Sequence, residues 1–294
     1  MSHPVVAGID GSERSLAAAD WAAGEALLRG VPLCLVHVLP PLPGADVPVP
    51  AAETLQHLGE HILHRAIADL GARYPDLQAR GEQAAGAPAT ALLAAAGEAG
   101  LLVVGARGSG GFDGLAVGSV ALHVSAAAAC PVVLVPERPV EGFGDGTRMA
   151  GDAPHVVAGF DAHRPVGEVV EFAFSAAEVR GARLRVVQAW ALPAEAVSPQ
   201  KLFVTEEDRA TWEDQEVLQL SDALRAWQDK YREVTTRTDV VLLHPAQALL
   251  NASRGAELVV VGRRVGRAEG PMGPVTHAVL HHTRCPVAVV PHGG

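Results

Sequence analysis

A glycine-rich turn, VVGARGSGGFDGLAVGSV at 103–120, carries the residues best suited to chemistry. Gly105 and Gly108 let the backbone turn sharply and come close to a ligand, and Gly118 followed by Ser119 opens a helix. A helix N-terminus leaves unpaired N–H groups and about half a positive charge, which suits phosphate oxygens. The pattern indicates either a phosphate-binding turn or a plain loop in which Ser119 caps its helix.

Two other candidate residues follow apolar segments that are typical of strands. Asp10 comes directly after VVAGI, and Val38 comes after LCLVH. In an open parallel sheet, ligands bind beyond the carboxyl ends of the strands, where the strand order reverses. Asp10, Val38 and the glycine-rich turn would meet at that edge, where Arg107 could add a charge-assisted hydrogen bond to an anion. This arrangement predicts a ligand site in the first half of the chain.

The glycine spacing differs from that of the common phosphate loops. The chain has no G-x-x-x-x-G-K-[ST] sequence, and no G-x-G-x-x-G follows the first predicted strand. Kinase and P-loop chemistry would therefore lack their lysine and their metal-binding hydroxyl.

Histidines offer metal chemistry in two places, and each has a plainer interpretation. His281 and His282 are adjacent, and side chains at i and i+1 of a helix do not face one another. Three histidines at i, i+4 and i+7 spacing form either a divalent-metal face or a solvated helix face: His57, His61 and His64. No cysteine or carboxylate cluster accompanies them, so no metal site is predicted. His37 lies in an apolar strand and is expected to be a hydrogen-bonded core residue.

The composition indicates a globular chain with large apolar cores. Of 294 residues, 49% are hydrophobic, 19% are charged and 4% are aromatic, which favours parallel-sheet packing with strands covered on both faces. The formal net charge of -10 and the lack of a basic stripe argue against nucleic-acid and anionic-membrane partners.

No segment of the sequence predicts a membrane span or an export signal. No apolar stretch reaches the roughly eighteen residues of a transmembrane helix, and the first residues lack a basic and apolar leader. The expected compartment is the cytosol. Three scattered cysteines are too few for a disulfide framework and are expected to be buried thiols: Cys34, Cys130 and Cys285.

The chain is a tandem repeat of two similar halves. HPVVAGIDGSERSLAAADWAAGEALLRGVPLCLVHVL, which begins at His3, matches PHVVAGFDAHRPVGEVVEFAFSAAEVRGARLRVVQAW, which begins at Pro154. The halves end alike, with CPVVLVP in the first and CPVAVVP in the second. We therefore predict domains at 1–138 and 154–294, joined by a Gly- and Pro-rich linker at 139–153.

Each half alternates predicted strands with predicted helices, which favours a doubly wound parallel sheet with right-handed crossovers. Gly30 and Gly71 are expected at helix C-caps, and Pro88 in a first turn. The first-half strands are predicted at 4–9, 32–38, 77–85 (weakly), 101–105 and 131–135. The helices between them are predicted at 13–29, 52–72, 88–99 and 118–129. The second-half strands are predicted at 155–160, 183–189, 235–243, 257–261 and 286–290.

The motif as a whole resembles one known family. The signature of the ATP-binding universal stress proteins is G-2x-G-9x-G-[ST]. This sequence matches it with Gly105, Gly108 and Gly118-Ser119, which are separated by two and by nine residues. GIDGS, LVHV and CPVVLVP agree with the flanks of that family. The resemblance implies an α/β chain of two tandem flavodoxin-like or Rossmann-like domains of the actinobacterial kind. Each would be a five-stranded parallel sheet of order 3-2-1-4-5 with helices on both faces.

The resemblance also implies the ligand and its contacts. ATP, alone or with Mg²⁺, is the expected adenine nucleotide. Asp10 would contact the ribose or adenine, the Val38 backbone would contact adenine, and the turn with the following helix start would hold phosphates and ribose. The implied residues are Gly8, Ile9, Asp10, Val38, Val104, Gly105, Arg107, Gly108, Gly118, Ser119 and Val120. Pairing of domains through the last strand is implied as well, either within the chain or in a homodimer.

The second half departs from this pattern. Val265 stands where the second glycine is expected, Pro274 replaces the serine, and the loop is two residues shorter. Proline removes both a hydroxyl and an N–H, although Gly266 could restore some backbone freedom. We expect weaker or absent nucleotide binding at the corresponding residues, which are Gly159, Phe160, Asp161, Ala189, Gly262 and Gly273.

The sequence favours a regulator over an enzyme. A nucleotide hydrolase needs a positioned general base and a metal-binding carboxylate near the terminal phosphate. Asp10 is the one acid at a strand end of the first half, and the resemblance assigns it to the nucleoside. Asp113, in the glycine-rich loop, either reaches a magnesium ion or is a solvated loop acid. We expect an ATP-dependent regulator or sensor of the stress response with no catalytic residue. A slow ATP hydrolase and a nucleotide-independent scaffold remain the alternatives.

Overall fold

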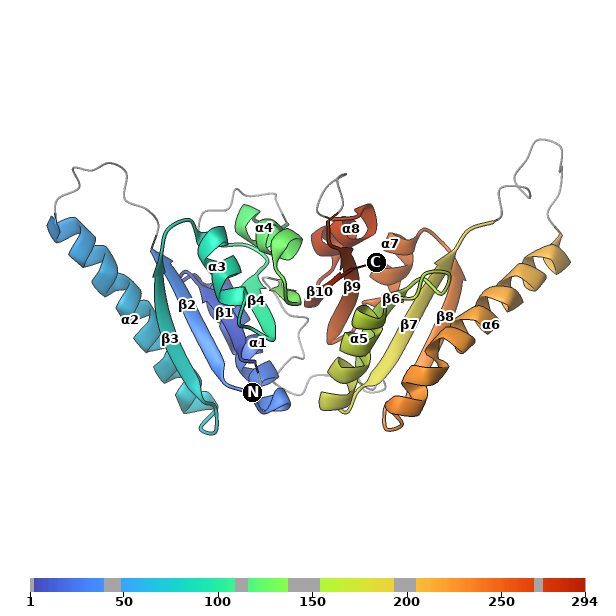
Figure 1. Ribbon diagram of the computed structural model, residues 1–294, viewed down its shortest axis with the longest axis horizontal. Coiled ribbons are helices and arrows are strands. Elements are labelled where there is room, and N and C mark those ends of the chain that lie inside the picture. Colours follow the sequence, from blue (N-terminus) through green and yellow to red (C-terminus); the bar gives the residue numbers. More distant parts are fainter. Residues whose placement is uncertain are drawn as a thin grey trace. The chain divides into compact units, whose positions relative to one another are not determined.

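The computed structural model describes residues 3–39, 49–108, 116–136, 154–192, 205–266 and 272–293 (Figure 1). The chain divides into two compact units, Met1–Pro139 and Val140–Gly294. The predicted linker at 139–153 and the loop acid Asp113 lie outside the described residues.

The first unit is a parallel sheet of order β3-β2-β1-β4-β5. This confirms the expected strand order 3-2-1-4-5. Its strands are β1 (Val5–Ile9), β2 (Leu33–Leu39), β3 (Ala79–Ala85), β4 (Leu101–Gly105) and β5 (Val132–Val135). Its helices are α1 (Glu13–Arg29), α2 (Val49–Arg73), α3 (Pro88–Ala96) and α4 (Ser119–Ala127).

The second unit repeats this topology as β8-β7-β6-β9-β10, again parallel between neighbours. Its strands are β6 (His155–Phe160), β7 (Arg183–Trp190), β8 (Thr236–Leu242), β9 (Leu258–Arg264) and β10 (Val287–His292). Its helices are α5 (Gly167–Val179), α6 (Glu206–Lys230), α7 (Pro245–Ala252) and α8 (Pro274–His282).

Helices cover both faces of each sheet, as Figure 1 shows. In the first unit α1 packs with α2, while α3 packs with α4. The second unit pairs α5 with α6 and α7 with α8. Right-handed crossovers place α1 and α2 on one face because β1, β2 and β3 advance in one direction, and α3 and α4 on the other because the order then reverses. The reversal leaves the carboxyl ends of β1 and β4 side by side.

The core lies where central strands are apolar on both faces. Leu33, Leu101 and Leu102 are completely or almost completely buried, as strands covered by two helix layers require. The outer strand β3 has the sequence ARGEQAA and is largely exposed. Its polar composition explains why this strand was only weakly predicted, since hydrophobic alternation is nearly absent.

Of the three residues predicted at helix ends, Gly30 and Pro88 lie where they were expected and Gly71 does not. Gly30 caps α1 in the left-handed conformation, with φ 63°, and Pro88 occupies the first turn of α3, as expected. The prediction of a C-cap at Gly71 is wrong, because α2 continues through it to Arg73. Nothing lies within 4 Å of the position a Cβ would take at Gly71, so the helix tolerates this glycine without using its conformational freedom.

The cysteines are buried thiols, as expected from their apolar surroundings. Burial raises the pKa of Cys130 to about 11 and also raises the pKa of Cys285. His57, His61 and His64 are all exposed on α2. Every helix within the described residues is too short or too polar to cross a membrane.

Candidate functional site

A cavity of about 550 Å³ in the second unit and one of about 440 Å³ in the first lie at the carboxyl ends of the central strands. All eleven residues predicted to bind nucleotide line the first-unit cavity. They come from the end of β1 and the residue after it, the end of β2, the end of β4 with the turn that follows it, and the start of α4. Segments separated by about a hundred residues are therefore brought together where the strand order reverses.

The Asp10 carboxylate is oriented by the turn that follows β1. Its Oδ1 accepts hydrogen bonds from the Ser12 backbone N–H (3.0 Å) and the Ser12 hydroxyl (2.6 Å). The Asp10 backbone N–H donates to Oγ of Ser15 (3.2 Å), and that buried hydroxyl donates to the Ser12 carbonyl (2.9 Å). This network fixes the direction of the carboxylate at the rim of the cavity.

The glycines of the turn permit close packing of backbone. A Cβ on Gly105 would lie 3.0 Å from the Arg107 carbonyl oxygen and 3.3 Å from that of Arg14. A Cβ on Gly108 would lie 3.0 Å from Oδ2 of Asp10. Gly108 and Asp10 are thus neighbouring walls of one cavity, although about a hundred residues separate them in the sequence.

The start of α4 presents hydrogen-bond donors to the cavity. Gly118 is the N-cap, and its N–H donates to the Ala106 carbonyl (2.7 Å), which ties the helix start to the end of β4. The first N–H bonded within the helix is that of Leu122, to the Gly118 carbonyl (3.0 Å). Ser119 occupies the first helical position, lines the cavity and does not cap the helix, so neither its N–H nor its hydroxyl is used in capping. The interpretation of Ser119 as a helix cap is therefore wrong.

Sequence reasoning missed part of the cavity lining. His37 is the hydrogen-bonded core residue that was expected, with Nδ1–H donating to the Ile9 carbonyl (2.9 Å), but it also lines the cavity. Pro88 and Leu92 of α3 form an apolar wall, and a Cβ on Gly8 would lie 2.9 Å from Cδ2 of Leu92. Gly8 therefore lets α3 approach the sheet. Pro88 and Leu92 are four residues apart and therefore lie on the same side of α3, which was the signal in the sequence that could have identified this wall.

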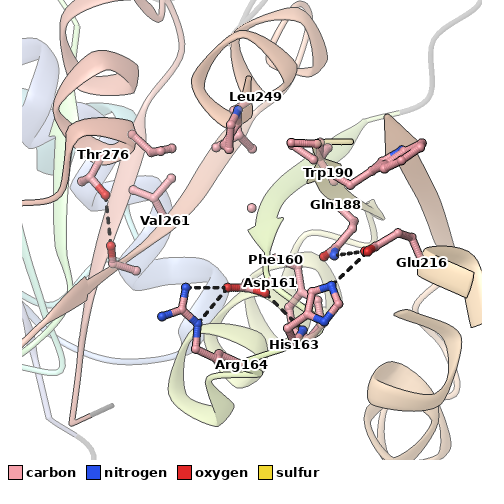
Figure 2. A pocket seen from close by; sticks show the side chains of 17 residues that line it. Phe160, Asp161, His163, Arg164, Gln188, Trp190, Glu216, Leu249, Val261 and Thr276 are labelled. Carbon is pink, nitrogen blue, oxygen red and sulfur yellow. Dashed lines mark hydrogen bonds and ion pairs between the residues drawn. The ribbon is translucent and has the colours of Figure 1, made fainter. Parts of the chain in front are cut away.

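The second-unit cavity is built from equivalent positions with different chemistry (Figure 2). Five of the six residues predicted for a weaker second site line it: Gly159, Phe160, Asp161, Ala189 and Gly262. The sixth, Gly273, is the N-cap of α8 and is not among the lining residues. Pro274 occupies the first position of α8, where Ser119 stands in α4.

A polar network crosses the second cavity, as Figure 2 shows. Glu216 of α6 accepts hydrogen bonds from Nε2 of His163 (2.9 Å) and Nε2 of Gln188 (2.8 Å). Oε1 of Gln188 accepts from the Ala162 backbone N–H (3.0 Å). Asp161 accepts from Nε of Arg164 (3.3 Å). Glu216, His163 and Arg164 were not predicted as site residues. The position of Glu216 depends on how α6 packs against β7, which the sequence pattern does not specify.

Comparison with known proteins identifies the family. The model of the universal stress protein family matches residues 1–136 and 153–291. The chain belongs to the universal stress protein family. Universal stress protein Rv2005c of Mycobacterium tuberculosis is 33% identical over 304 residues, covering 98% of this chain and 96% of that protein. Rv1996 of the same organism is 30% identical over 308 residues, covering 97% and 94%.

The fold of this universal stress protein also matches solved structures over its full length. A universal stress protein from Archaeoglobus fulgidus superimposes with a TM-score of 0.70 at 17% identity, covering all of both chains. A putative universal stress protein from Pseudomonas aeruginosa gives a TM-score of 0.57 at 17% identity, covering 99% of this chain and 94% of that one. These likenesses concern the fold alone.

Proposed function

We propose that this universal stress protein is a regulator that binds ATP in the cavity of its first unit. The observation that carries the proposal is the convergence of all eleven predicted nucleotide-binding residues on that one cavity. Bound nucleotide would change the conformation or the oligomeric state of the protein through its different affinity for each state.

The cavity suits a nucleotide in size and in the distribution of its chemistry. A volume of about 440 Å³ falls within the range of roughly 300–1,000 Å³ that is usual for small-molecule sites. Val36, Val38 and Leu92 supply apolar walls for a purine ring. Arg107 and the first turn of α4 supply the cationic side chain and the N–H groups that a polyphosphate needs.

Each residue then has a definite role in binding. The Asp10 carboxylate accepts a hydrogen bond from a ribose hydroxyl, and its Ser12 partners hold it in that direction. Gly105 and Gly108 let the backbone of the turn approach the phosphates without interposed side chains. Ser119 adds a hydroxyl donor at the positive end of the α4 dipole. Mg²⁺, where it accompanies ATP, would neutralise charge on the phosphates.

The described lining favours binding over hydrolysis. Asp10 is the one carboxylate among the described lining residues, and in this proposal it contacts the nucleoside and not the phosphates. N–H groups and a hydroxyl that hold the phosphates equally well before and during reaction give no acceleration of the chemical step.

The test is the identity and location of bound nucleotide in the full-length protein. Extraction of purified protein followed by mass analysis is expected to release an adenine nucleotide. Calorimetry with ATP is expected to show weaker binding for Asp10→Ala than for the matched control Asp76→Ala, because Asp76 is exposed and lies outside the cavity lining. Equal affinities of these two variants would reject the first-unit cavity as the ATP site.

A further inference from the structure

We propose that the cavity of the second unit binds a nucleoside without phosphate groups. The ligand class is an uncharged ring compound that carries hydroxyl or amine donors, of which adenosine is the simplest probe. This site is separate from the proposed ATP site, and either proposal can fail without the other.

The second cavity has lost phosphate donors. Pro274 at the first position of α8 has neither the N–H nor the hydroxyl that Ser119 offers in α4. The hydroxyl of Thr276, which lines the cavity, donates to the Gly262 carbonyl (3.0 Å) and is therefore occupied by the protein itself. Val265, at the position of the second glycine, is 53% exposed and is not part of the lining.

The charges of the second cavity disfavour an anion. Its described lining holds two carboxylates, Asp161 and Glu216, against one guanidinium, that of Arg164. Arg164 is already paired with Asp161, with its Nη2 3.3 Å from Oδ2. The described lining of the first cavity holds one carboxylate, that of Asp10, and one guanidinium, that of Arg107. Among the described lining residues, a triphosphate in the second cavity would face one more negative charge in a partly desolvated space, where repulsion between like charges is strong.

The same groups suit a neutral ligand with donors. Glu216 is held by Gln188, which is 2% exposed, and by His163, so its carboxylate is fixed at the cavity wall. A carboxylate has about four acceptor sites, and these two bonds use only two of them. An acidic residue that accepts from ribose hydroxyls is a common arrangement at the nucleoside end of doubly wound folds.

The apolar walls match a ring of nucleoside size. Phe160, Trp190, Leu249 and Val261 line the cavity around the polar network (Figure 2). A Cβ on Gly159 would lie 3.0 Å from Cδ1 of Leu249, so this glycine lets α7 close one wall against β6. The volume of about 550 Å³ leaves room for a ring and a sugar.

In the first unit, different residues occupy the position of the contact between Glu216 and Gln188. Its strand position equivalent to Gln188 is His37, as the pairings Phe160 with Gln188 and Ile9 with His37 establish. The long helix α2 places Gly59 against that histidine, since a Cβ on Gly59 would lie 2.7 Å from Cδ2 of His37. The second unit instead places the Glu216 carboxylate of α6 on Gln188. The acid is thus particular to the second cavity.

The test locates each ligand on the full-length protein by hydrogen exchange and mass spectrometry. Adenosine is expected to protect peptides from β7 and from the middle of α6, while ATP is expected to protect peptides from the turn after β4 and the start of α4. Absence of protection by adenosine in β7 and α6, or equal protection of these segments by ATP, would overturn the proposal.

A matched pair of variants on α6 tests the role of the carboxylate. Glu216→Gln is expected to weaken adenosine binding by about tenfold, because hydrogen bonds to a charged acceptor are stronger than those to an amide. Glu207→Gln makes the same change at an exposed position of the helix outside the cavity and is expected to leave affinity unchanged. ATP affinity of Glu216→Gln reports separately on the first cavity. Equal adenosine affinities of the two variants would reject Glu216 as the recognition group and with it the proposal.

Discussion

At the scale of single residues, a few substitutions distinguish two cavities built on the same framework. Ser119 and Pro274 occupy the same helical position in α4 and α8, and both follow an N-cap glycine. Proline is well tolerated at this position because the N–H there has no partner within the helix. The exchange therefore changes what the helix start offers a ligand and leaves the helix itself intact.

Ser119→Pro is predicted to weaken ATP binding by about tenfold or more, since an N–H and a hydroxyl donor to phosphate are lost together. Circular dichroism is expected to remain that of the original protein. The reverse change, Pro274→Ser, serves as the control and is expected not to create an ATP site, because the additional carboxylate of Glu216 remains in the second cavity. Titration calorimetry measures both, and an unchanged ATP affinity of Ser119→Pro would contradict the prediction.

Gly108→Val is predicted to weaken ATP binding through Asp10 as well as through the phosphates. A Cβ at this position lies 3.0 Å from Oδ2 of Asp10, so the branched side chain must displace the carboxylate. Asp10→Ala alone is expected to cost about 1.5–3 kcal/mol of binding free energy. Because both changes disturb one contact, the double variant is expected to lose less than the sum of the two single losses. Additive losses measured by calorimetry would show that the residues act independently.

At the scale of elements, local signals were sufficient where burial and capping agree. The helix at 13–29 and the strand at 155–160 have their predicted bounds, because an N-cap serine, a C-cap glycine and a short buried apolar run define them. Strand β9 extends beyond the predicted 257–261 to Arg264, since Arg263 and Arg264 pair with Pro291 and His292 of β10 despite being polar. The sequence signal for β3 was weak for the same reason. Pairing with β2 maintains this strand, and its residues are mostly not hydrophobic enough to indicate it.

The candidate site residues also fall into two groups, those that the local sequence predicts and those that depend on the packing of a neighbouring element. The first cavity was predictable because its polar residues lie directly at strand ends and in one turn. His37, Leu92 and Glu216 were not, since their contribution depends on which side of a strand or helix meets a neighbouring element. The spacing of residues in the sequence shows which of them share one side of an element, and it does not show which neighbouring element packs against that side.

Two glycines of the first unit provide a paired test of helix ends. Gly30→Ala is predicted to destabilise the protein by about 1 kcal/mol, because φ is 63° and alanine is strained there. Gly71→Ala is predicted to stabilise it by about 0.5–1 kcal/mol, since α2 is helical at that position and the space for a Cβ is open. Free energies of unfolding from urea titrations decide the signs, and the same sign for both variants would contradict this account of the two helix ends.

At the scale of the whole molecule, two similar units are expected to do different work. One ATP per chain is predicted to bind, and turnover is predicted to stay far below the ~10 per second that is typical of enzymes. Phosphate release is measured with excess ATP and Mg²⁺, with Asp161→Ala as a control that leaves the first cavity unaltered. Release that depends on Asp10 and exceeds the background of protein-free ATP would establish an ATPase and replace the regulator proposal.

The outer strand β3 has a consequence for how this protein behaves at high concentration. It ends the sheet of the first unit, so one of its backbone edges has no strand partner within that unit. Such an edge can recruit a strand from a partly unfolded neighbour and begin an aggregate, and charged side chains along it obstruct that pairing. Arg80 and Glu82 are both exposed on β3. The polarity that made this strand hard to predict therefore also protects the edge of the folded chain from pairing with exposed strands of other molecules.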